Sequence, residues 1–180
     1  MSDTAADIVE AAEADPIDPD RLESLCDAAS HDERVEAIRS FGRSVQKRLF
    51  EATAGREVTI DQIVPPETPP MQQVIHEGQN TLPAFRAFQK RFCRPDAEEG
   101  EHANELWGYN EQTFQVVTGP GYFVAYDDEE TGEVCVDYRR IPPRAPSEWP
   151  ELKPNEVRLG RFVYAGTVDR LRRISEHMTI

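Results

Sequence analysis

Residues 113–126 read TFQVVTGPGYFVAY, two runs of apolar and aromatic residues on either side of a Gly-Pro-Gly. If residues 119–121 form a hairpin loop, Val116 faces Val124 and the large side chains of both runs collect on one face. A half-buried antiparallel strand pair has this pattern. The stretch therefore predicts a hairpin whose glycines set the register.

The next run, residues 133–141 (EVCVDYRRI), continues the alternation. Pairing Tyr126 with Val134 across the intervening acidic loop also brings Val124 opposite Val136, which extends the same apolar face. Upstream, residues 105–110 (ELWGYN) predict a fourth strand. The sequence thus indicates an α+β fold with a mainly antiparallel meander of four or more strands, with curvature left open.

The opposite face of this sheet combines aromatic rings with charged and hydrogen-bonding groups. Ligand sites commonly have apolar walls with a few convergent polar groups. An arginine there could hold a carboxylate or phosphate. The alternative is a solvated or helix-covered face in which Asp137 and Arg139 satisfy each other. The predicted ligand-binding residues are Trp107, Tyr109, Gln115, Phe123, Asp137 and Arg139.

Helices are predicted on both sides of the sheet region. Asp18-Pro19 and the Ser30–Glu33 capping box are start signals, and they predict an N-terminal helical pair over 18–55 that Gly55 ends. The phenylalanine spacing in 83–93 and the apolar spacing in 167–178 predict two further helices, the second of them C-terminal.

A chain of 180 residues suits one domain, here 18–180, in which a sheet-containing body (56–180) follows the helical pair. Residues 1–17 are expected to be an acidic flexible segment, either a frayed helix or disordered. The net charge of −14 is concentrated at the start, since residues 1–36 hold 12 acidic and 2 basic residues. Such a segment repels phosphate, so nucleic acid is not an expected partner. The chain has no long uncharged apolar run and no signal-peptide pattern, so a cytoplasmic protein without a membrane partner is expected.

Motifs for a metal, a cofactor or an activated nucleophile are absent from the sequence. The three cysteines have no C-x-x-C spacing and are expected to be free, mostly buried thiols. The four histidines have no ligand spacing, although a site that joins His76, His102 and a carboxylate in space stays open. We therefore expect no cofactor, and an enzyme is less favoured than a binding protein.

Five segments, LWGYN, TGPGYFVA, VDYRRIPP, RFVYAG and LPAFRAFQKRFCRP, are similar to a family of uncharacterised bacterial proteins. The resemblance spans roughly residues 56–180 and implies no activity and no site. The favoured hypothesis is non-catalytic binding of a small molecule or lipid on the aromatic and polar sheet face. The alternatives are a protein-interaction or self-association domain, and an enzyme with a spatially assembled histidine and carboxylate site.

Overall fold

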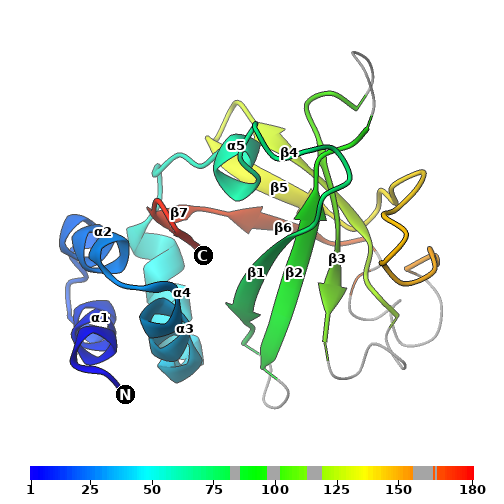
Figure 1. Ribbon diagram of the computed structural model, residues 1–180. Coiled ribbons are helices and arrows are strands. Elements are labelled where there is room, and N and C mark those ends of the chain that lie inside the picture. Colours follow the sequence, from blue (N-terminus) through cyan, green and yellow to red (C-terminus); the bar gives the residue numbers. More distant parts are fainter. Residues whose placement is uncertain (82–85, 97–101, 113–118, 156–163, 165) are drawn as a thin grey trace.

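A computed structural model of the protein describes residues 1–81, 86–96, 102–112, 119–155, 164 and 166–180. Within them the chain forms an α+β fold in which a layer of helices lies to one side of a curled antiparallel sheet (Figure 1). The predicted fold class is confirmed at this level. No helix in these ranges is both long and apolar enough to cross a membrane.

The helical layer begins with α1 (Asp3–Glu13), α2 (Pro19–Ala28), α3 (His31–Ser40) and α4 (Arg43–Ala52). The two predicted start signals are confirmed: the Asp18 side chain accepts from two backbone amides of α2, and Ser30 forms a full capping box with Glu33. Gly55 adopts the expected left-handed conformation after α4, with φ 79°.

The helical pair predicted over residues 18–55 is wrong, because the structure has three helices there, α2, α3 and α4. The second helix of the pair is split at Phe41 and Gly42, where Gly42 caps the start of α4. Phe41, Val45 and Leu49 are buried in the same apolar cluster as residues of α1, α2 and α3. In residues 1–17, where a frayed helix or disorder was expected, the chain forms α1, whose small apolar face, Ala5, Ile8, Ala11 and Ala12, is buried.

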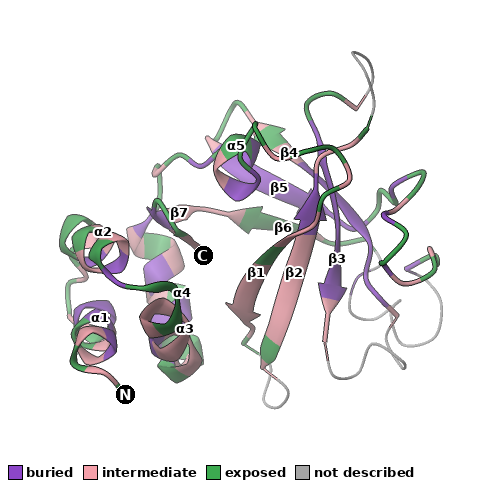
Figure 2. Ribbon diagram, in the orientation of Figure 1, coloured by how far each residue is buried: buried purple, intermediate pink, exposed green. Residues whose placement is uncertain are grey.

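The sheet is a six-stranded meander in which every neighbouring pair is antiparallel. Its strands are β1 (Val74–Gln79), β2 (Ala87–Cys93), β3 (Leu106–Glu111), β4 (Phe123–Asp128), β5 (Glu133–Asp137) and β6 (Val168–Leu171). A one-turn helix, α5 (Ile60–Ile63), contacts β4. Figure 2 shows that β3, β4 and β5 are the most deeply buried strands, whereas β1 and β2 keep partial exposure.

The expected register of the meander is wrong by one residue. Val124 pairs with Asp137 on β5, where Val136 was predicted, and with Trp107 on β3. The predicted pairing of Val124 with Val116 involves residues 113–118, which lie outside the described residues. A one-residue shift exchanges the two faces of a strand, which is why Phe123 turns to the face opposite to the predicted one.

The helix expected over 83–93 is wrong for the described part, because residues 87–93 form β2 in the interior of the sheet. Phe88, Lys90 and Phe92 alternate onto one face, a period of two that fits a strand. Each edge of β2 is hydrogen-bonded, to β1 on one side and to β3 on the other. Tertiary pairing therefore overrides the helical spacing of the phenylalanines.

The predicted C-terminal helix over 167–178 is also wrong. The segment forms β6, which pairs with β5, and then a small hairpin of β7 (Arg173–Ser175) and β8 (Met178–Thr179). All five residues of β5 are buried, so its backbone groups need a partner strand on that side. β6 supplies this partner, and pairing takes precedence over the helical spacing.

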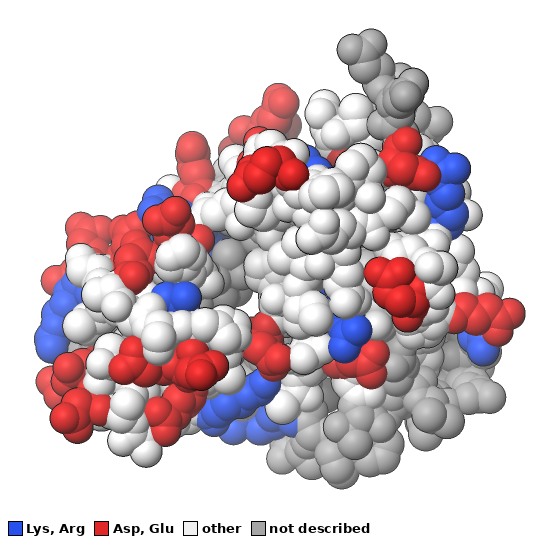
Figure 3. All heavy atoms as spheres, in the orientation of Figure 1, with Lys and Arg blue, Asp and Glu red and all other residues white. Residues whose placement is uncertain are grey.

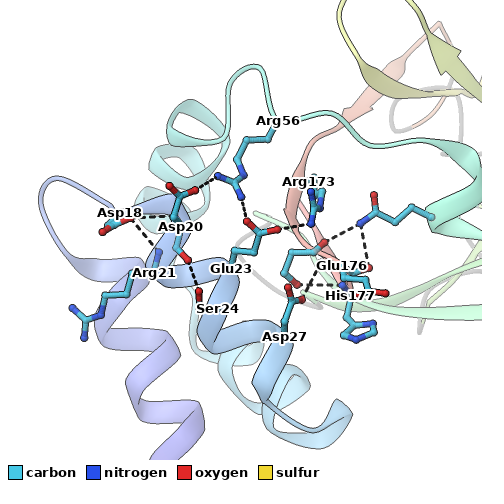
Figure 4. A network of polar contacts seen from close by, with 12 residues as sticks. Asp18, Asp20, Arg21, Glu23, Ser24, Asp27, Arg56, Arg173, Glu176 and His177 are labelled. Carbon is cyan, nitrogen blue, oxygen red and sulfur yellow. Dashed lines mark hydrogen bonds and ion pairs between the residues drawn. The ribbon is translucent and has the colours of Figure 1, made fainter.

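The β7–β8 hairpin belongs to the helical layer. Ile174 is buried in the same apolar cluster as the helices, whereas the concave face of the sheet forms a separate cluster. A polar network fixes the hairpin against α2: Glu23 pairs with both Arg56 and Arg173, and Asp27 accepts from the amide of Glu176 at 2.9 Å (Figure 4). Acidic side chains dominate the outer surface of these helices (Figure 3).

Candidate functional site

The predicted site residues do not form one open surface. Trp107 and Tyr109 share the convex face, where both are almost fully buried, at 0% and 1% exposure. Phe123 is on the concave face, and Gln115 lies outside the described residues. The structure brings together only Trp107, Tyr109 and Asp137 on one face.

This convex face is a second small core. The ring of Trp149 packs edge-on against Tyr109, with 5.0 Å between centroids, and lies 6.3 Å from Tyr122. A proline-rich connection, residues 141–154 (IPPRAPSEWPELKP), follows β5 and contains Trp149. Asn155 holds its end on the sheet by donating to two main-chain carbonyls, both at 2.7 Å. The aromatic side chains predicted to meet a ligand therefore meet the protein itself.

Asp137 and Arg139 satisfy each other, as the alternative interpretation of this face proposed. The guanidinium donates to both carboxylate oxygens of Asp137 at 2.8 Å. These bonds lower the pKa of Asp137, although burial opposes them. Arg139 keeps more than half of its side chain exposed and points out of the aromatic cluster.

The concave face holds an ionisable group that the sequence prediction missed. Lys90, in the middle of β2, has a side chain that is only 12% exposed. Its ammonium nitrogen lies 5.0–5.8 Å from the centroids of three aromatic rings, those of Phe88, Phe123 and Tyr138. A cation close to aromatic rings is stabilised by their quadrupoles, the more so when water is excluded.

Three oxygen atoms surround the Lys90 ammonium. It donates to the Tyr138 hydroxyl, to Asn110 Oδ1 at 3.4 Å and to Asp169 Oδ2 at 3.3 Å. Asp169 is on β6, and three strands separate it from β2 in the sheet order. The two side chains can meet only because the sheet curls strongly around this face.

The charge states of this cluster follow from its surroundings. Burial acts to lower the pKa of Lys90, but Tyr138 and Asp169 outweigh it and the pKa is raised. Burial raises the pKa of the Tyr138 phenol. At neutral pH the cluster therefore holds an ammonium ion beside a neutral phenol, and the side chain of Asp169 next to them is half exposed.

Lys90 lies at the edge of a cavity of about 430 Å³, here called the concave groove, between the helical layer and the sheet. Apolar side chains from four elements line it: Phe50 of α4, Ile63 of α5, Phe88 and Phe92 of β2, and Leu171 of β6. The polar groups include His76 and Glu77 of β1 together with Lys90 and Asp169. Its volume is within the range of small-molecule sites.

The two histidines considered for an enzyme are on opposite faces of the sheet. His76 lies on the concave face, where Nε2 is 2.8 Å from the Ile63 carbonyl, and burial lowers its pKa. His102 pairs with Glu105 at 3.0 Å and packs against Trp107 on the convex face. Within the described ranges, no group of three or more His, Cys, Asp or Glu residues could hold a metal ion. All three cysteines are free and buried, as expected.

Comparison with known proteins found no matching family model, curated protein or solved structure. The resemblance to a bacterial family therefore stays a prediction.

The sequence did contain a signal for the Lys90 cluster. In residues 88–92 (FQKRF) the lysine stands between two phenylalanines at a spacing of two, which places a cation on an apolar strand face. A helical interpretation of the same residues hides this juxtaposition. Its partners, Asn110, Tyr138 and Asp169, are distant in sequence and only the sheet topology brings them together.

Proposed function

We propose that the protein binds a small amphipathic molecule in the concave groove and does not act on it chemically. The observation that carries this proposal is the position of Lys90, a buried ammonium at the edge of an apolar cavity of about 430 Å³. Burying an ion costs free energy when the protein folds. An apolar side chain of similar length could occupy the position of this lysine without that cost. The presence of a cation at this place fits a role in holding a ligand.

The mixture of surfaces in the groove supports an amphipathic ligand. Phe88, Phe92 and Leu171 offer apolar area, and the polar groups cluster around Lys90 and Glu77. A molecule with an apolar body and one polar end could bury its body while keeping its polar end hydrogen-bonded. The favoured function is thus the one expected from the sequence, moved from the convex to the concave face.

The test is calorimetric titration of the full chain with 1-decanol, a probe with an apolar body and a neutral polar end. We expect saturable binding that is weakened at least about tenfold by Thr81→Trp, because Thr81 is exposed at the rim and the indole would fill the opening. The matched control is Ala54→Trp, also exposed but outside the groove, which should bind decanol normally. Absence of saturable binding, or equal effects of the two tryptophans, would contradict the proposal.

A further inference from the structure

The oxygen atoms around Lys90 differ in how firmly they are held. Tyr138 and Asn110 are both 4% exposed and form the floor of the cluster. The side chain of Asp169 is 52% exposed. Of the three, only the Asp169 contact can be exchanged without unpacking the sheet.

The same three partners also differ in charge. The phenol of Tyr138 and the amide of Asn110 are neutral, so Asp169 is the one carboxylate bonded to Lys90 among the described residues. A buried ammonium that loses its counter-ion is strongly destabilised, whereas an exposed carboxylate loses little when it returns to water. Any group that displaces Asp169 must therefore be an anion.

We infer that the concave groove selects an amphipathic carboxylate whose carboxyl group takes the place of Asp169 beside Lys90. This inference rests on the proposed function and adds the chemical class of the ligand. The apolar body lies along Phe88, Phe92 and Leu171, and the carboxylate accepts from the Lys90 ammonium. Asp169 then turns to solvent.

A carboxylate fits this position better than a phosphate. The position is already filled by a carboxylate oxygen, at 3.3 Å from Nζ. A single ammonium balances one negative charge. Phosphate groups are held by several donors at once, as by bidentate guanidinium groups or the amides at a helix start. The guanidinium of the neighbouring Arg170 is engaged with Asp128 and Glu133.

The experiment compares decanoate with 1-decanol, at pH 8 and constant ionic strength, on the full chain and on two variants. We expect the full chain to bind decanoate at least about tenfold more tightly than decanol, since a charge-assisted hydrogen bond is added. Asp169→Asn removes the competing carboxylate and should tighten decanoate binding. Lys90→Met should weaken decanoate binding at least about tenfold. Because decanol carries no charge, Lys90→Met should weaken decanol binding by less than it weakens decanoate binding, and Asp169→Asn should not tighten decanol binding.

A control separates local charge from net charge. Glu67→Gln changes the charge by the same amount as Asp169→Asn but is exposed and outside the groove, so it should leave decanoate affinity unchanged. If circular dichroism shows that Lys90→Met does not fold, the decanoate affinity of Asp169→Asn, compared with that of the full chain, tests the inference by itself. Asp169 is exposed, so its substitution should not disturb folding.

The possible results distinguish the two proposals. Equal affinities for decanoate and decanol, with no gain in Asp169→Asn, would overturn the carboxylate inference and leave the groove as a site for neutral amphiphiles. Failure of both probes to bind would overturn the proposed function itself. A gain for decanoate in Asp169→Asn that Glu67→Gln does not reproduce supports the inference.

Discussion

Arg39 at the end of α3 and Glu77 on β1 form an ion pair of 2.7 Å that joins the helical layer to the edge of the sheet. Arg39 also donates to the Gly78 carbonyl at 2.6 Å, and the Gln79 amide group donates to the Phe41 carbonyl at 3.0 Å. The helices and the concave face have separate apolar clusters. Polar contacts such as these therefore form much of the junction between the helical layer and the sheet, beside the concave groove.

Arg39→Met should test this junction. We expect it to lower the free energy of unfolding by about 1–2 kcal/mol, because it removes charge-assisted hydrogen bonds at a partly exposed site. Urea denaturation measures the change. Arg43→Met, at an exposed position at the start of α4, is the control and should shift stability by less than about 0.5 kcal/mol. Equal losses would show that Arg39 has no special part in the junction.

Trp149→Ala should separate the convex core from the concave groove. The indole is 6% exposed and packs on Tyr109 and Tyr122, so its loss should cost about 3–5 kcal/mol. Decanol affinity, measured where the variant is still folded, should be unchanged. A small loss of stability combined with loss of decanol binding would instead indicate that the ligand binds on the convex face, beside Trp107 and Tyr109.

Gly108→Ala should be destabilising for a steric reason. A Cβ atom at Gly108 would lie 2.3 Å from the Phe123 ring and 2.6 Å from the Arg91 carbonyl oxygen. Overpacking of this kind costs about 1–3 kcal/mol, measurable as a lower midpoint in thermal or urea unfolding. Gly42→Ser is the matched control, because its Cβ would meet open space and serine is a favoured residue at a helix start. It should be neutral or stabilising, and a comparable loss there would refute the steric argument.

Acid should weaken the fold through Glu133. Burial acts to raise the pKa of Glu133, but the bonds from Arg172 and Arg170 outweigh it and the pKa is lowered. A lowered pKa in the folded state adds stability that is present above the unfolded value of about 4.3 and is lost as the pH falls below it.

Glu133→Gln should lower the free energy of unfolding by about 1–3 kcal/mol at pH 7 and make its decline between pH 6 and pH 3 less steep. Denaturant titrations across this pH range measure both effects. Glu129→Gln, exposed at the tip of the neighbouring hairpin, should leave the profile unchanged. An unaltered profile in Glu133→Gln would mean that the carboxylate is not stabilised as described.

Local signals predicted the starts of α2 and α3 and the class of the fold. Asp18 and Ser30 act through bonds to amides two or three residues away, so the sequence around them contains the whole interaction. The alternation that indicates strands also held for β3, β4 and β5. By contrast, the register of Val124 depends on which strands flank it, and that information is spread over the chain.

The site was less accessible to prediction for the same reason. The one-residue error in register exchanged the two faces of β4, and it placed Phe123 on the same face as Trp107. The helical spacing of the phenylalanines concealed Lys90, whose contacts span 20 to 79 residues of sequence. Such a cluster exists only once strands β2 to β6 have curled into place.

The β7–β8 hairpin has a consequence for the order in which the protein folds. The apolar cluster of the first 50 residues is completed by Ile174, so it requires closure of a loop that contains the entire sheet. Closure over such a distance costs entropy before any contact compensates for it, and it slows folding. The helices therefore emerge from the ribosome well before their last core residue is made, and in that interval they present an unfinished apolar surface.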